Sequence, residues 1–132
     1  DCLAACPWNK FAASASEMKL KAREDLKEPS IAFLLTLDDQ AFRAFFSGSP
    51  VKRIGRDRFV RNVLIAAGNS GDRGFIDQCR SLSADASPVV RGMAIWALKR
   101  LMSQGEFALF ADARGPEDDA EVKDEWTMAG VV

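Results

Sequence analysis

The chain has 132 residues, of which 48% are hydrophobic and 28% charged, a composition that suits one soluble domain with its own core. It contains no histidine and no tyrosine, which excludes Ser-His-Asp triads and every histidine-based zinc pattern. The net charge of −1 excludes a global attraction to nucleic acid, and no apolar run has the length of a membrane span, so no membrane partner is expected.

Two cysteines, Cys2 and Cys6, stand at the start of the chain in the stretch DCLAACPWN. Bacterial cluster-binding runs end with the same C-x3-C-P spacing, but a [4Fe–4S] cluster takes four thiolates and the only other cysteine is Cys79. The pattern is therefore half of a metal site, or else two buried thiols. An odd, small number of cysteines and the lack of a secretory signal pattern indicate a reducing compartment, and we expect a cytoplasmic location.

The first predicted helices are marked by their caps. Ser14 and Glu17 have the spacing of a capping box, which predicts a helix running to about Lys27. Asp38 is expected to cap the next helix, which should end near residues 47–50, where the sequence reads SGSP.

A basic segment follows, in which residues 52–61 carry five basic residues and one acidic residue. Arginine suits phosphate because its planar fork donates two parallel hydrogen bonds, so this segment is a candidate RNA contact. The alternative is a solvated helix face with local salt bridges, for instance to Asp57. Residues 112–125 have the opposite balance, with seven acidic and two basic residues. The candidate RNA-binding residues are Lys52, Arg53, Arg56, Arg58 and Arg61.

Three stretches from here on resemble one another. VRNVLIAAGN begins at Val60, VRGMAIWALK at Val90 and VKDEWTMAGV at Val122, at spacings of 30 and 32 residues. Self-similarity at such a period is typical of a helical solenoid. Partner helices are expected between the units, at about 72–82, which contains Cys79, and about 103–113.

The repeat resembles the HEAT-like repeats of helical scaffold proteins, and it predicts an all-α, right-handed helical solenoid of HEAT-like repeats of the PBS-lyase type. Asp85 and Arg91 match that family's habit of linking adjacent repeats through a carboxylate and a guanidinium. We expect Arg91 to bind Asp85 or a carboxylate of a neighbouring repeat. An irregular helical domain with chance similarity is the alternative.

Two stretches together indicate a family more specifically than the cysteine spacing or the repeat does. They are CPWNKFA at the start and SGSPVKRIGRDRFVRNVLIAAGNSGD from Ser47. They resemble the C-terminal part of the epoxyqueuosine reductases, in which a ferredoxin-like region ends with C-x2-C-x3-C-P-W-N. Cys2 and Cys6 match the last two cysteines of that motif, and its first cysteine would lie before Asp1. The resemblance implies that the chain is a fragment of a longer protein.

What the resemblance implies is a parent oxidoreductase that reduces epoxyqueuosine to queuosine in tRNA, with cobalamin and two [4Fe–4S] clusters. Cys2 and Cys6 would be cluster ligands in that parent only, and the cobalamin-binding domain and catalytic residues would precede this chain. The expected parts are the end of the ferredoxin-like motif at 1–12, linking helices at 13–50 and the HEAT-like repeats at 51–132. The fragment itself would hold no cofactor and would not be catalytic. Its partners would be tRNA and the N-terminal domains of the parent.

Two other functions are compatible with a helical solenoid. A protein-interaction scaffold of an iron–sulphur protein should expose an apolar groove, which Trp96 and Trp126 could line, although their helical spacing favours a place in the core. A chromophore lyase subunit with similar repeats is the third possibility, but it leaves the CPWN motif unexplained.

Overall fold

The computed structural model describes residues 5–11 and 23–130, and every regular element in these ranges is helical. The prediction of an all-α fold is therefore confirmed for the part of the chain that the structure describes. No helix there is both long and apolar enough to cross a bilayer. The α-helices are α1 (Ile31–Leu35), α2 (Asp39–Phe45), α3 (Arg56–Ser70), α4 (Ile76–Leu82), α5 (Pro88–Leu101), α6 (Gln104–Asp112) and α7 (Ala120–Met128). The short 3-10 helices are η1 (Pro7–Phe11), η3 (Glu24–Leu26), η4 (Pro50–Ile54) and η5 (Arg73–Phe75).

The helix predicted to run from Ser14 to about Lys27 falls largely outside the described residues, and its C-terminal end is wrong. Arg23 has extended backbone, so the single 3-10 turn η3 does not continue an α-helix. The extended conformation is accompanied by contacts of the Arg23 side chain, which forms an ion pair with Asp25 and donates to the Ser47 carbonyl oxygen at 2.9 Å.

The predicted cap at Asp38 is confirmed, because its carboxylate accepts a hydrogen bond from the backbone N–H of Ala41 at 2.7 Å and begins α2. Phe42 of this helix and Phe46, which caps its C-terminus, are buried and form a small cluster of aromatic rings with Phe59 of α3. The cluster holds the N-terminal end of α3 against α2.

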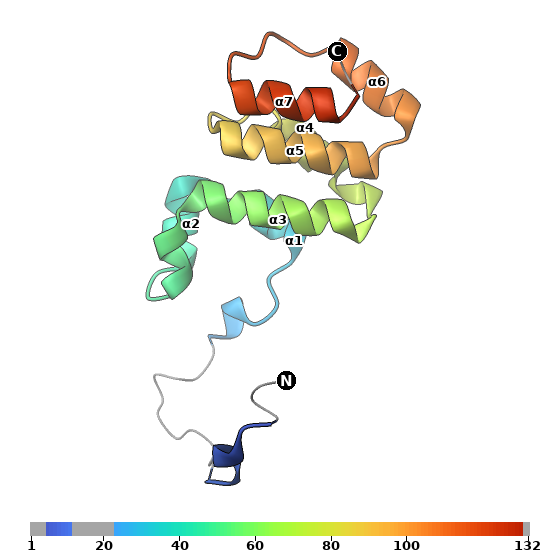
Figure 1. Cartoon of the computed structure of the whole chain (residues 1–132). Helices are drawn as coiled ribbons and strands as arrows, with labels where there is room; N and C mark the ends of the chain where they lie inside the picture. Colours follow the sequence, from blue (N-terminus) through green and yellow to red (C-terminus); the bar gives the residue numbers. More distant parts are fainter. Residues whose placement is uncertain (1–4, 12–22, 131–132) are drawn as a thin grey trace.

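Helices α3, α5 and α7 are stacked on one another and begin at the same edge of the molecule, on the left in Figure 1. Val60, Val90 and Val122 occupy equivalent positions in the three helices and are all buried, with exposed fractions of 0%, 0% and 1%. The residues four and seven positions further along the chain are buried in all three cases as well. The spacings of 30 and 32 residues in the sequence therefore correspond to one recurring core position.

The expected partner helices also form, as α4 and α6. Cys79 lies on α4, as predicted, and is fully buried in the main core. The start of α6 is a capping box in which Ser103 and Glu106 each accept a hydrogen bond from the other's backbone N–H group.

Gly68 explains how closely α3 and α5 approach. A Cβ atom added at this position would lie 2.7 Å from Cζ3 of Trp96 and 3.1 Å from the Cα of Ala97. Both distances are shorter than ordinary carbon contacts, so the absence of a side chain at Gly68 permits the spacing between the two helices.

Candidate nucleic-acid interface

The basic segment forms η4 and the first turns of α3. Ser49 caps η4 through its side chain, and Pro50 stands at the first position of that turn. Gly55, with a φ of 79°, then lets the chain turn sharply into α3, a conformation that is costly for other residues. This local structure brings the five predicted cations into the short stretch from Lys52 to Arg61.

Three of the five predicted cations, Lys52, Arg53 and Arg58, are exposed and form no ion pair with another described residue. Arg61 is half-buried, and its guanidinium donates to the side-chain oxygen of the adjacent Asn62. These four side chains keep their capacity to bind an anion.

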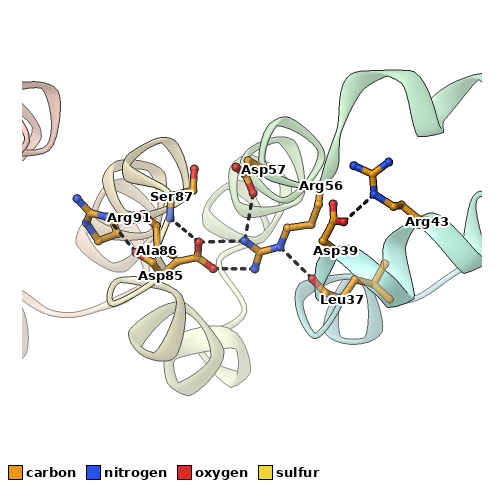
Figure 2. A network of polar contacts seen from close by, with 9 residues as sticks. All are labelled: Leu37, Asp39, Arg43, Arg56, Asp57, Asp85, Ala86, Ser87 and Arg91. Carbon is orange, nitrogen blue, oxygen red and sulfur yellow. Dashed lines mark hydrogen bonds and ion pairs between the residues drawn. The ribbon is translucent and has the colours of Figure 1, made fainter.

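Arg56 differs from the other four because it is engaged inside the molecule. Its guanidinium donates to both carboxylate oxygens of Asp85, at 2.9 and 2.7 Å, and to the Leu37 carbonyl oxygen at 3.1 Å. Only 14% of the Arg56 side chain is exposed. Figure 2 shows this guanidinium lying between Leu37 on one side and Asp85 on the other. Arg56 therefore joins three segments of the fold and has few donors left for a phosphate.

Asp85 links the start of α3 to the start of α5. Besides Arg56, it binds the backbone N–H of Ser87 at 2.9 Å, next to the first residue of α5. Desolvation alone would raise the pKa of Asp85, but the hydrogen bonds from Arg56 and Ser87 outweigh it and hold the pKa below its usual value.

The predicted link through Arg91 is confirmed with a carboxylate of the following unit. Its guanidinium binds Glu117 through two hydrogen bonds of 2.8 Å, and it also donates to the carbonyl oxygens of Asp85 and Ala86. The hydrogen bond with Arg91 is the main cause that lowers the pKa of Glu117 to about 2. The backbone carbonyl oxygen of Asp85 thus accepts a hydrogen bond from Arg91, while its carboxylate binds Arg56.

Asp85 and Glu117 are equivalent residues, 32 positions apart, and we call the two ion pairs that they form the ion-pair ladder. Each carboxylate accepts from an arginine of the preceding stacked helix and from the backbone N–H two residues further on. Neither Glu117 nor the Arg56–Asp85 pair was predicted from the sequence. The signal was an acidic residue two positions before the N-cap of each helix, at the repeat spacing.

The role of Cys2 and Cys6 as cluster ligands of a parent protein stays a prediction. Cys2 lies outside the described residues, and Cys6 is a half-buried free thiol. Among residues 5–11 and 23–130 no group of three or more His, Cys, Asp or Glu side chains is arranged to hold a metal ion. Burial raises the pKa of the Cys79 thiol to about 11, so this cysteine is an inert core residue.

The tryptophans named as possible groove residues belong to the packed interior. Trp126 is 7% exposed and packs against Phe107 and Phe110. Trp96 is partly buried against the main core, with the Arg100 guanidinium over its ring. Trp126 also lines a pocket with Phe110, but Arg91 and Glu117 share its walls, so this pocket is not an apolar groove. The preference for a place in the core is confirmed for Trp126.

The fold and the ladder define an all-helical module of stacked helices joined by ion pairs. No family model matches the chain. It is 37% identical over 106 residues to an epoxyqueuosine reductase of Alicycliphilus denitrificans, covering 74% of this chain and 29% of the relative. Epoxyqueuosine reductases of Xanthomonas campestris and Pseudomonas aeruginosa are 36% and 30% identical to it, and it covers 28% of each.

A solved structure of the epoxyqueuosine reductase from Streptococcus thermophilus has the same fold over 97% of this chain, with a TM-score of 0.78 and 24% identity. The chain covers 34% of that structure. The resemblance to the epoxyqueuosine reductases is therefore confirmed: the chain corresponds to a part of these proteins, and spans less than a third of the length of the curated relatives it matches.

Proposed function

We propose that the chain is the C-terminal helical-repeat module of an epoxyqueuosine reductase and that it docks tRNA for the cobalamin-dependent reduction of epoxyqueuosine to queuosine in the cytoplasm. The observation that carries the proposal is the similarity to three such reductases, at 30–37% identity over about three quarters of the chain. The module itself contributes docking, and the redox chemistry belongs to the rest of the parent protein.

The repeat architecture supports the first half of the proposal. The buried positions recur from α3 to α5 to α7, and the ion-pair ladder joins successive units, as in a right-handed solenoid of HEAT-like repeats of the PBS-lyase type. We assign residues 51–132 to these repeats, residues 13–50 to linking helices and residues 1–12 to the end of the ferredoxin-like motif. Leu35 of α1 shares the main core with α3 and α5, so the linking helices stabilise the repeats.

The chain's own thiols do not suffice for a cluster. Cys2 and Cys6 provide two of the four thiolates that a [4Fe–4S] cluster needs, and Cys79 is enclosed in the helical core. The proposal therefore assigns the other ligands of this cluster, the second cluster and the cobalamin to the N-terminal domains of the parent.

The exposed cations support the second half of the proposal. Lys52, Arg53 and Arg58 gather around the turn into α3, and no carboxylate of the described chain neutralises them. Cations in this state attract a phosphate backbone and position it without reading its sequence. Arg61 extends this group along α3, whereas the role of Arg56 is to hold Asp85.

A salt titration of tRNA affinity tests the docking role. In the parent reductase, the triple variant Lys52→Gln/Arg53→Gln/Arg58→Gln should bind tRNA more weakly, and the slope of log affinity against log salt should fall by about 0.7–0.9 for each phosphate that the variant no longer neutralises. A control with the same charge change, Lys27→Gln/Arg80→Gln/Lys99→Gln, removes exposed cations from other elements. Equal affinity and slope for the two variants would contradict tRNA docking by the basic segment.

A protein-interaction scaffold is the second candidate, and one observation favours it. Leu109 on α6 and Met128 on α7 are 72% and 80% exposed, although both are large apolar side chains. If the basic variant leaves tRNA binding unchanged, while Leu109→Ser/Met128→Ser weakens the association of the chain with the N-terminal domains of its parent, the scaffold is the better description.

A further inference from the structure

The stacked helices share a shallow groove that crosses all three of them. Its lining includes Arg61 from α3, Val89 and Met93 from α5, and Glu121 and Glu125 from α7. We call this surface the stacked face. Because α3, α5 and α7 lie side by side in that order, the face leads from the basic segment to the last helix without a break (Figure 1).

The charge of the stacked face changes sign along the stack. The α3 end carries Arg61, with the exposed Arg58 one turn earlier, and the middle is apolar at Val89 and Met93. The α7 end carries Glu121 and Glu125, and neither forms an ion pair with a described residue. Desolvation raises the pKa of Glu125, as expected for a half-buried carboxylate.

We propose that the α7 end of the stacked face is a repulsive boundary for RNA, which confines phosphate contacts to the α3 end and so fixes the register of the bound RNA on the module. The inference rests on the proposed tRNA docking. Glu121 and Glu125 would repel the phosphate backbone of any RNA that runs along all three stacked helices, and such repulsion against wrong poses gives specificity. The poses that remain cross only the basic segment.

The cations of the basic segment extend beyond the groove. Arg61 lines the groove together with Glu121 and Glu125, whereas the exposed Lys52, Arg53 and Arg58 do not line it. The Debye length at physiological ionic strength is about 8 Å, so the two carboxylates act mainly on a phosphate that enters the groove or reaches α7.

The test compares two double variants of the parent reductase that change the net charge equally. Glu121→Gln/Glu125→Gln removes the boundary, and Asp77→Asn/Asp112→Asn removes two exposed carboxylates of α4 and α6, which do not line the stacked face. The probes are the substrate tRNA and a structured RNA of the same length and unrelated sequence. The affinity for each is measured at several salt concentrations.

We expect the boundary variant to bind the unrelated RNA about 3–10-fold more tightly than the wild type does, with a salt slope steeper by about 0.7–0.9 for each additional phosphate that it binds. Affinity for the substrate tRNA should change less than twofold, and Asp77→Asn/Asp112→Asn should change neither affinity by more than that. Glu121→Lys, at an exposed site, should enhance the binding of unrelated RNA further.

If the two double variants behave alike and Glu121→Lys does not strengthen the binding of unrelated RNA, the boundary does not exist. Glu121→Lys is an independent measurement, because it changes one exposed residue and does not depend on the folding of the double variants. The basic variant Lys52→Gln/Arg53→Gln/Arg58→Gln, measured in parallel, separates the two claims. A loss of tRNA binding there, with no effect at α7, would overturn the boundary alone. No loss would overturn both the docking and the boundary.

Discussion

Arg56 and Arg58 lie two positions apart in a run of cations but have opposite roles. Arg56 binds Asp85 and the Leu37 carbonyl group with a side chain that is only 14% exposed, while Arg58 is exposed and has no ion-pair partner among the described residues. Charge alone does not distinguish the two in the sequence. Their surroundings do, because a guanidinium at the first residue of α3 is within reach of the start of α5.

Replacing these two arginines should separate stability from RNA binding. Arg56→Gln should lower the free energy of unfolding by about 2–4 kcal/mol, because it leaves the largely buried Asp85 carboxylate without its cation. Arg58→Gln should change it by less than about 0.5 kcal/mol. Urea denaturation followed by circular dichroism measures both values. Equal costs for the two substitutions would contradict the internal role of Arg56.

Gly68 provides a second test at the scale of one residue. Gly68→Ala should destabilise the chain by about 1–2 kcal/mol, because the added methyl group meets Trp96 and the backbone at Ala97, and this overpacking exceeds the gain in helix propensity. Gly105→Ala in α6 is the matched control. Nothing lies within 4 Å of a Cβ there, so it should be neutral or stabilising by up to about 1 kcal/mol. Thermal unfolding of both variants gives the comparison, and a stabilised Gly68→Ala would show that α3 and α5 have room to spare.

At the scale of elements, the ion-pair ladder joins each stacked helix to the next. The arginine belongs to one helix, and its carboxylate stands just before the start of the following helix, where it also binds a backbone N–H. A single carboxylate therefore orients a helix start and fixes its distance from the previous helix. Since Glu117 is 17% exposed, its pair with Arg91 has less screening by water than the surface pairs of this chain.

Glu117→Gln should weaken the attachment of α7 in a pH-dependent way. At pH 7 we expect a loss of about 1–3 kcal/mol in the free energy of unfolding, because charge-assisted hydrogen bonds are replaced by neutral ones. The pKa of Glu117 is lowered to about 2, so its contribution is complete above the ordinary pKa of a glutamate and is lost as the pH falls from about 4.5 to 2. The difference between the wild type and the variant should shrink through that window in urea titrations.

The control for this prediction is Glu24→Gln, which breaks the exposed pair between Glu24 and Lys27. Its cost should stay below about 0.5 kcal/mol at every pH, because both side chains are more than half exposed. A cost for Glu117→Gln that equals that of Glu24→Gln, or that grows as the pH falls, would contradict the ladder.

At the scale of the whole molecule, the chain corresponds to only a part of the proteins that it resembles. It spans less than a third of the curated reductases that it matches, and Cys2 and Cys6 offer at most half of the ligands of one cluster. We therefore expect the isolated chain to purify colourless, without the broad visible absorption near about 400 nm that is typical of iron–sulphur centres. Absorption spectroscopy and iron analysis check this. A brown preparation with about four irons per chain would contradict it.

The sequence by itself determined the helical class, the Asp38 cap, and the recurring core position at Val60, Val90 and Val122. These features are local or periodic. A helix buries one stripe of its surface, so its buried residues recur at a regular spacing that can be recognised in the sequence. The link through Arg91 was also predicted, because the resemblance to HEAT-like repeats implied an ion pair between adjacent units.

Only the tertiary structure decided which cations are free. Arg56 finds Asp85 29 positions along the chain, and Arg91 finds Glu117 across a gap of 26. Such pairings depend on how α3, α5 and α7 stack, and on the missing side chain at Gly68 that sets the spacing of the first two. A run of like charges in the sequence does not show which of its cations are paired. The strength of an ion pair depends on the distance and burial of its two groups, and both are set by the packing of the helices.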